Sequence, residues 1–175
     1  MPRLIPSPFL SLLPALWLWA AASAHAAPSG APEIERLFRQ GQPTLALQRA
    51  DESLAAEPQN ASLRFLKGVM LSETGRAAEA ITVFEQLTQD FPELPEPYNN
   101  LAVLLAASGQ LDAARSALET ALRHDPAYRT AHENMGDVLT RLAQRAYEAA
   151  AAGRSAEPAL QRKLRLVREL SGAAR

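Results

Sequence analysis

Proline and glycine recur along this chain at a fixed distance. Three prolines are spaced 34 residues apart, and three glycines show the same spacing. They are Pro58, Pro92 and Pro126, and Gly41, Gly75 and Gly109. The same step relates two sets of small residues, which are Gly68, Ala102 and Gly136, and Ala46, Ala80 and Ala114. A period of this length indicates stacked helical hairpins, an architecture that offers a surface for binding rather than a catalytic centre.

This spacing resembles that of the tetratricopeptide repeat (TPR). If the three prolines occupy position 32 of each unit, the units begin at Ala27, Ala61, Pro95 and Arg129. The resemblance assigns the small residues to positions 8 and 20, where two helices approach closely, and a larger side chain to position 24. It assigns glycine to the left-handed turn after the first helix, and proline to the end of the second. The chain is therefore predicted to be an all-α, right-handed TPR solenoid.

The first and last units depart from this pattern. In the first unit, Ile34 stands at the small position 8 and Ala50 at the larger position 24, as expected of a terminal unit with one unpacked face. In the fourth unit, Ala143 replaces the turn glycine and Glu148 replaces the small residue at position 20. We therefore expect about three and a half helical hairpins. Whether the fourth unit turns near Ala143 or continues as one long helix is open.

The first 26 residues have the features of a cleaved signal peptide. Residues 9–22 form a nearly uninterrupted apolar run, and Ala24 and Ala26 supply a small-x-small cleavage signal. The run has 14 residues, which is fewer than the ~20 that a helix needs to span a bilayer. We expect cleavage after Ala26. The alternative is an uncleaved anchor with Trp17 and Trp19 at the membrane interface.

The amino-acid composition favours one cellular compartment and argues against one class of partner. The chain contains no cysteine, so an exported form must obtain its stability from helix packing, and a bacterial periplasmic protein is favoured. Without residues 1–26, the chain has 17 basic and 19 acidic residues, a net charge of −2. That balance argues against a surface for duplex nucleic acid. The charge is unevenly distributed, because residues 154–175 carry +4 and the remainder carries −6.

Residues 154–175 are predicted to form a basic amphipathic capping helix. Leu160, Leu164 and Val167 recur at helical spacing, and Pro158 stands where a first helical turn tolerates proline. Such a helix would cover the apolar face of the last repeat, since solenoids need caps for solubility. The alternative is a helix that contacts anionic lipid or an acidic partner. The predicted division is a signal peptide at 1–26, a TPR domain at 27–153 and the capping helix at 154–175.

The sequence predicts no catalytic, metal or cofactor site. His124 and His132 are eight residues apart and form no pair with metal-ligand spacing. Phosphate-binding glycine loops, a nucleophile elbow and cysteine pairs are missing. Glu133 and Asp137 share one helical face and could bind a cation, although such pairs more often form a solvated acidic strip. We therefore expect a protein that is not an enzyme and needs no cofactor.

By the resemblance, function is expected on the concave face. TPR proteins usually bind extended peptides or partner helices there, through positions 2, 5, 9, 12 and 13 of each first helix. The candidate partner-binding residues, with Asn100 at position 6 added, are Phe65, Val69, Ser72, Glu96, Asn99, Asn100, Val103, Glu133 and Asp137. This face begins apolar and becomes acidic, so we expect a protein or peptide ligand with apolar anchors and a basic residue. Alternatively, Phe65, Val69 and Val103 pack between adjacent hairpins.

Two further comparisons with TPR subfamilies narrow the function. The subfamily that grips the C-terminal carboxylates of cytosolic chaperones has a basic residue and Asn at positions 5 and 9 of one unit, and Lys and Arg at positions 2 and 6 of a later unit. This chain has Phe65, Val69, Thr130 and Asn134 at those positions, so the resemblance implies no carboxylate clamp. Residues 94–102 and 130–137 resemble segments of exported proteobacterial TPR proteins of unassigned activity. We expect a periplasmic, non-catalytic adaptor or scaffold of the cell envelope. The alternatives are a self-assembling homo-oligomer and a basic C-terminal helix docked on a membrane.

Overall fold

A computed structural model of the chain describes residues 30–152 and 157–173. These residues form eight helices and no strand. The helices are α1 (Ala31–Arg39), α2 (Pro43–Ala56), α3 (Ala61–Glu73), α4 (Ala77–Asp90), α5 (Pro95–Ala107), α6 (Leu111–His124), α7 (Arg129–Ala151) and α8 (Pro158–Ala173). The prediction of an all-α solenoid is confirmed. The predicted signal peptide lies outside the described residues.

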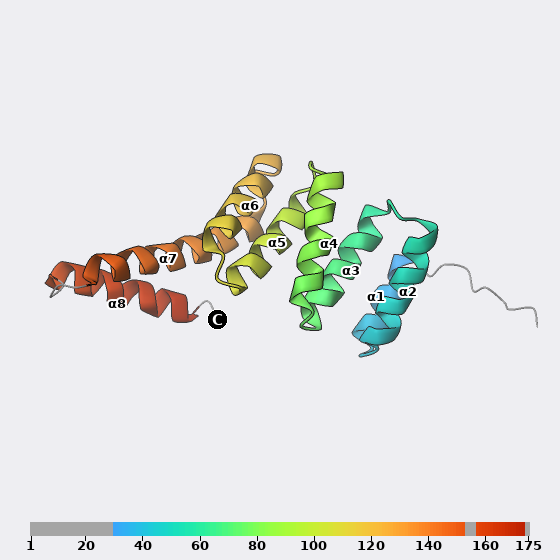
Figure 1. Cartoon of the computed structure of the whole chain (residues 1–175), viewed down its shortest axis with the longest axis horizontal. Coiled ribbons are helices and arrows are strands. Elements are labelled where there is room, and N and C mark those ends of the chain that lie inside the picture. The colour runs from blue at the N-terminus through green and yellow to red at the C-terminus, as the bar shows by residue number, and fades with distance from the viewer. Residues whose placement is uncertain (1–29, 153–156, 174–175) are drawn as a thin grey trace, which may run out of the picture.

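The helices stack as a row of antiparallel hairpins (Figure 1). Each hairpin pairs a first helix with a second helix, as α1 with α2, α3 with α4, and α5 with α6. The first helices also contact one another along the row, α1 with α3, α3 with α5, and α5 with α7. One continuous face of the solenoid is therefore built from first helices. None of the described helices is both long enough and apolar enough to cross a membrane.

The periodic glycines and prolines mark the helix ends. Gly41, Gly75 and Gly109 have φ values of 76°, 77° and 84°, a left-handed conformation that costs glycine no side-chain clash. Each donates its N–H to a carbonyl three residues back, and the next residue donates to a carbonyl five residues back, which is the Schellman arrangement. The second helices α2, α4 and α6 each end two residues before the periodic proline, because the residue before proline avoids helical backbone angles.

Positions 8 and 24 of each unit share a fixed amount of space. A Cβ atom on Gly68 would lie 2.7 Å from the ring of Phe84, so the small residue makes room for the large one. In the first unit the sizes are reversed, yet Ile34 and Ala50 are both fully buried. The exchange of sizes roughly conserves volume, which cores tolerate well. The unpacked outer face expected of this terminal unit stays a prediction.

The fourth unit does not turn. α7 continues for 23 residues through Ala143, because no glycine is present there to adopt the left-handed conformation. The unit consequently lacks a second helix, and a Cβ atom on Gly136 would meet nothing within 4 Å. Position 8 of this unit thus borders open space, in contrast to Gly68.

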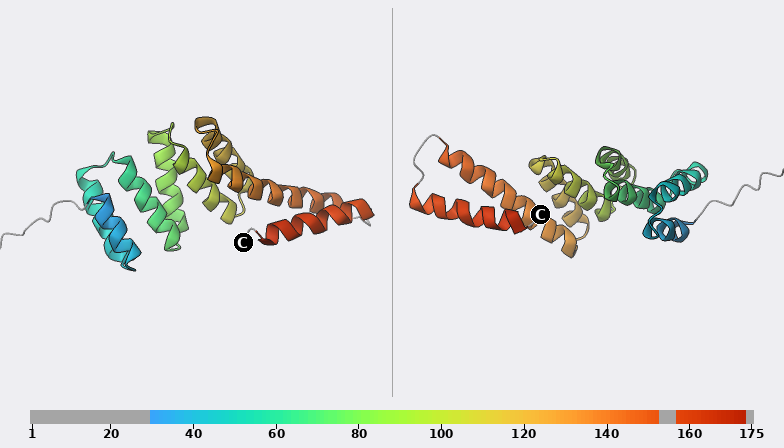
Figure 2. Two further views of the ribbon diagram at one scale, coloured as in Figure 1. Left: turned by 180° about the vertical axis from the view of Figure 1, so that it is seen from behind. Right: turned by 90° about the horizontal axis from the view of Figure 1, so that it is seen from below.

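α8 returns along α7 as an antiparallel partner (Figure 2). It contacts α7 and no other described helix. Leu164 is buried, and Leu160 and Val167 are half-buried, whereas Leu166 and Leu170 are exposed. The apolar stripe therefore faces α7 as predicted, but α8 lengthens the end of the solenoid rather than covering the last complete hairpin.

Candidate functional site

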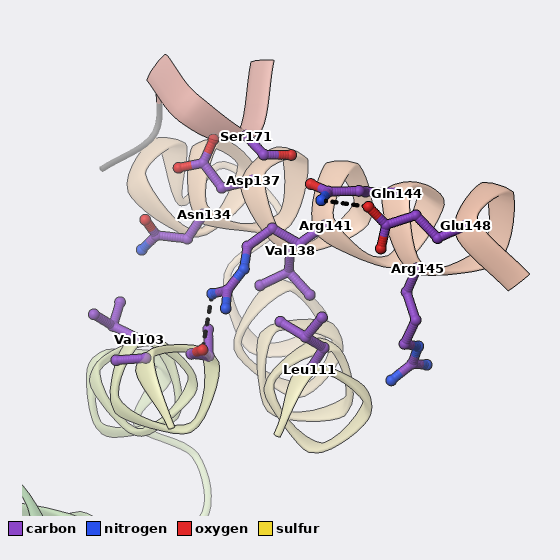
Figure 3. Close-up of a pocket in the computed structure, with 12 residues that line it drawn as sticks. Val103, Leu111, Asn134, Asp137, Val138, Arg141, Gln144, Arg145, Glu148 and Ser171 are labelled. Atoms are coloured by element: carbon purple, nitrogen blue, oxygen red, sulfur yellow. Dashed lines mark hydrogen bonds between the residues drawn. The ribbon is translucent and has the colours of Figure 1, made fainter. Parts of the chain in front are cut away.

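A groove lies where α7 leaves the solenoid. It has a volume of about 720 Å³ and is bounded by α5, the start of α6, α7 and the end of α8. Figure 3 shows side chains from these helices converging on it. The residues that line it are Val103, Ala106, Ala107, Leu111, Asn134, Asp137, Val138, Arg141, Gln144, Arg145, Glu148 and Ser171. The groove therefore combines an apolar floor with charged and amide side chains.

Two hydrogen bonds between side chains of α7 and residues of α5 hold the groove in shape. Asn134 donates its Nδ2 to Oδ1 of Asn99 at 2.8 Å. Arg141 donates its Nη1 to the carbonyl oxygen of Ala106, also at 2.8 Å. Both bonds join residues 35 positions apart, so α5 and α7 run in the same direction with one constant offset. The carbonyl oxygen of Ala106 also accepts the N–H of Gly109, so the bond from Arg141 gives this oxygen a second donor.

The structure gives the two predicted asparagines local roles. Asn99 is 5% exposed, and its carbonyl oxygen already accepts the bond from Asn134. Asn100 is half-buried and donates its amide to the carbonyl of Glu96 at 2.9 Å. Asn99 therefore supports the groove from beneath, and the carbonyl oxygen of Asn100 is the group left for a ligand. Their contact with a partner stays a prediction.

The charged groups of the groove differ in whether they are paired. Arg145 donates to Asp112 at 2.8 Å, and the guanidinium holds the pKa of Asp112 below its ordinary value. Hydrogen bonds from Gln144 and then from Arg168 lower the pKa of Glu148 in the same way.

The acidic residues predicted for this face are unpaired. Glu96, Glu133 and Asp137 are exposed, and none forms an ion pair with another described residue. Asp137 and Val103 both line the groove, and Val103 is 46% exposed. An apolar contact and a free negative charge are thus available in the same groove.

A second, smaller cleft contains Phe65. It measures about 320 Å³ and lies between α3, the end of α4 and the start of α5. Phe65 and Glu96 line it, and the Phe65 ring packs edge-on against Phe84 with centroids 5.7 Å apart. Val69 and Ser72 are half-buried farther along α3. The nine predicted residues therefore do not form one site, because they are shared between two clefts and the surface around them.

Sequence reasoning missed much of the α7 wall. Among the predicted residues, only Val103 and Asp137 line the larger groove. Arg141 stands at position 13 of its unit, a position that lines concave faces, and the repeat pattern contained that signal. Gln144, Arg145 and Glu148 contribute only because α7 continues past Ala143, which is one of the two outcomes that the missing turn glycine left open.

The described residues offer no catalytic arrangement. No group of three or more histidine and carboxylate side chains among them could hold a metal ion. His132 contacts the carbonyl oxygen of Pro126 at 2.9 Å through its Nε2, and His124 stacks on Tyr98 with ring centroids 6.0 Å apart. His124 thus contacts a residue of its own repeat, and His132 contacts the end of the preceding repeat. The chemistry available in the grooves is hydrogen bonding, ion pairing and apolar contact.

Comparisons with known proteins agree with this architecture. Two family models, each described as tetratricopeptide repeat, match residues 33–95 and 71–135. The first TPR of Spaghetti (RPAP3), bound to an HSP90 peptide, is 18% identical with a TM-score of 0.61, covering 64% of this chain and 89% of that chain. The second TPR domain of human RPAP3, in complex with an HSP70 peptide, is 18% identical with a TM-score of 0.57, covering 62% and 90%. A thermophilic TPR protein from Thermus thermophilus is 20% identical with a TM-score of 0.58, covering 81% and 80%.

Proposed function

The chain belongs to the tetratricopeptide repeat family, and we propose that it is a non-catalytic adaptor that binds a peptide or helix of a partner protein along its row of first helices. TPR domains are in general modules for protein interaction, and two of the similar structures hold peptides. The observation that carries the proposal is the open groove beside α7, which is lined by exposed Val103 and by the unpaired carboxylate of Asp137. Groups of this kind recognise a ligand without reacting with it.

The chemistry of this face favours a ligand with apolar and basic side chains. Phe65 offers an aromatic surface in the smaller cleft, and Val103 offers an aliphatic one in the larger groove. Glu96, Glu133 and Asp137 add negative charge that no described residue neutralises. The positions that grip a C-terminal carboxylate in the chaperone-binding subfamily are occupied here by Phe65, Val69, Thr130 and Asn134, none of which is basic. We therefore propose a partner other than the acidic end of a chaperone.

We place this adaptor in the bacterial periplasm. The proposal rests on the apolar run and small-x-small signal of residues 1–26, and on the absence of cysteine from the sequence. A cell-envelope process is the corresponding context, with cleavage after Ala26.

The proposed function is tested by capturing a partner from envelope extracts and then changing the two clefts separately. Phe65→Ala should weaken binding by about 2 kcal/mol or more at any salt concentration, since a central aromatic anchor dominates an interface. Asp137→Lys should weaken binding mainly at low salt, because an exposed charge acts chiefly through screened, long-range attraction.

Matched controls separate binding from folding. Phe91→Ala removes a half-buried aromatic side chain at the end of α4, and Glu85→Lys reverses an exposed charge on α4, which is a second helix. Both controls should bind the partner as the parent does, with helical circular dichroism retained. If the controls abolish binding while Phe65→Ala and Asp137→Lys leave it intact, the face of first helices is not the binding surface.

A further inference from the structure

The last helix displays an apolar and basic face that nothing in the described chain covers. α8 packs on α7 through Leu164, and the residues about half a turn away point outward. On that outward side, Leu166 is 54% and Leu170 is 60% exposed. Arg162 lies one turn before Leu166, is exposed, and forms no ion pair with a described residue.

Charge identifies what this face would bind. α8 carries four basic residues and one acidic residue, a net of +3, while residues 30–152 carry 17 acidic and 11 basic residues, a net of −6. The solenoid of the same protein thus carries the charge opposite to that of α8. Asp137 lines the groove and has no ion-pair partner among the described residues, and Glu133, which is also unpaired, lies one turn before it on α7.

The outward face of α8 cannot reach the groove of its own chain. α8 is held against α7 by the buried Leu164 and by the 3.0 Å ion pair between Arg168 and Glu148. Lys163 also lies over the ring of Tyr147, 5.6 Å from its centroid. Because Leu166 and Leu170 lie about half a turn from Leu164, these contacts keep both leucines on the side away from α7. Only a second copy of the chain can bring this face to the groove.

We propose that the outward face of α8 docks in the α5–α7 groove of a second copy, joining molecules head to tail. The proposal rests on the proposed function in one respect, namely that this groove is a binding site. Leu166 and Leu170 are one helical turn apart, about 6 Å along the axis, and so are Val103 and Ala107 on α5.

The distribution of charge sets the direction of docking. The helices α5 and α7 are parallel. Glu133 and Asp137 lie in the N-terminal half of α7, and Val103 and Ala107 lie toward the C-terminal end of α5. Arg162 precedes Leu166 by one turn. The docked α8 therefore runs in the same direction as α5, with its leucines on the apolar floor and Arg162 between the two carboxylates.

The experiment uses two complementary variants of the purified protein. Leu166→Asp/Leu170→Asp removes the docking face, and Glu133→Lys/Asp137→Lys reverses the charge of the groove. In sedimentation velocity at low salt, the parent's mass should rise with concentration. Each double variant should associate about tenfold or more weakly than the parent, since like charges brought together at an interface oppose association. Circular dichroism checks that both remain helical.

Mixing the two variants gives the decisive result. Each retains the surface that the other lacks, so an equimolar mixture should form a dimer and nothing larger, because a head-to-tail contact between them cannot continue. A mixture that stays monomeric while the parent associates would overturn the proposal. Association of the groove variant on its own as strongly as the parent would also overturn it, in favour of pairing between identical α8 faces. Leu139→Asp is the matched control on α7 and should associate as the parent does.

Other results would also overturn the inference and name a different occupant. If Leu139→Asp alone abolishes association, the open face of the fourth unit is the contact. If the parent is monomeric at every concentration but binds vesicles containing anionic lipid through Leu166 and Leu170, the occupant is a membrane. A parent protein that stays monomeric and binds no vesicles would show that α8 is not a docking helix. In each case, loss of the captured partner by Phe65→Ala would still support the proposed function.

Discussion

Alanine at position 8 should have opposite effects in two units of the same solenoid. A Cβ atom on Gly68 would lie 2.7 Å from one carbon of the Phe84 ring and 2.8 Å from another, whereas ordinary contact begins at 3.4 Å. Phe84 is fully buried and packed edge-on against Phe65, so its ring cannot swing into solvent. Inserting a methyl group into a close-packed core costs about 1–3 kcal/mol, which offsets the ~1 kcal/mol that alanine gains over glycine in a helix.

Gly136 provides the matched comparison. It occupies the same repeat position within α7, is exposed, and has nothing within 4 Å of a Cβ atom. Gly136→Ala should therefore raise the free energy of unfolding by about 1 kcal/mol. The free energy of unfolding of Gly68→Ala should be lower than that of Gly136→Ala by about 1–3 kcal/mol. Relative to the parent, Gly68→Ala should therefore range from roughly neutral to about 2 kcal/mol destabilising.

Urea denaturation followed by circular dichroism measures both changes, provided that the slope of the transition stays constant. The penalty at Gly68 should shrink in a Phe84→Leu background, because the ring atoms that meet the new methyl group are gone. Equal stabilisation by alanine at the two glycines would refute the view that position 8 is restricted by the second helix of its own unit.

Two further predictions concern the ends of the chain. Leu164→Asp should destabilise the docking of α8 by about 2–4 kcal/mol, through lost apolar contact and a badly placed charge. Hydrogen exchange should then increase in α8 and the end of α7, while α1 to α6 stay protected. Uniform loss of protection would contradict the finding that α8 contacts α7 alone. The form recovered from the periplasm should begin at Ala27, and an intact mass that retains Met1 would contradict the proposed cleavage.

The repeat period predicted the inner boundaries of the solenoid well because each boundary has a local steric cause. Gly75 must adopt a positive φ, and Pro92 cannot continue a helix, so the turn and the stop are set within a few residues. These requirements hold wherever the unit packs. The beginnings of α3, α5 and α7 at Ala61, Pro95 and Arg129 follow from the same spacing.

The candidate site was less predictable because it depends on contacts between units. Asn99 has the position of a ligand-facing residue, yet Asn134 of the next unit takes its carbonyl oxygen. The long α7 was equally hidden, since an absent glycine at position 143 permits a helix without requiring one. Arg145 and Glu148 entered the groove only through that extension. A repeat pattern describes one unit at a time, whereas these features arise from contacts between two neighbouring units or helices.

The unbroken length of α7 has a mechanical consequence. Its 23 residues span roughly 35 Å at 1.5 Å per residue. The first half is tied to α5 through Asn134 and Arg141, and the second half is tied to α8 through Glu148. With no turn between them, the two halves form one continuous helix and move together. A load that tilts the α7–α8 hairpin is therefore transmitted to the wall of the groove, and a ligand that widens the groove swings the far end of the hairpin in return.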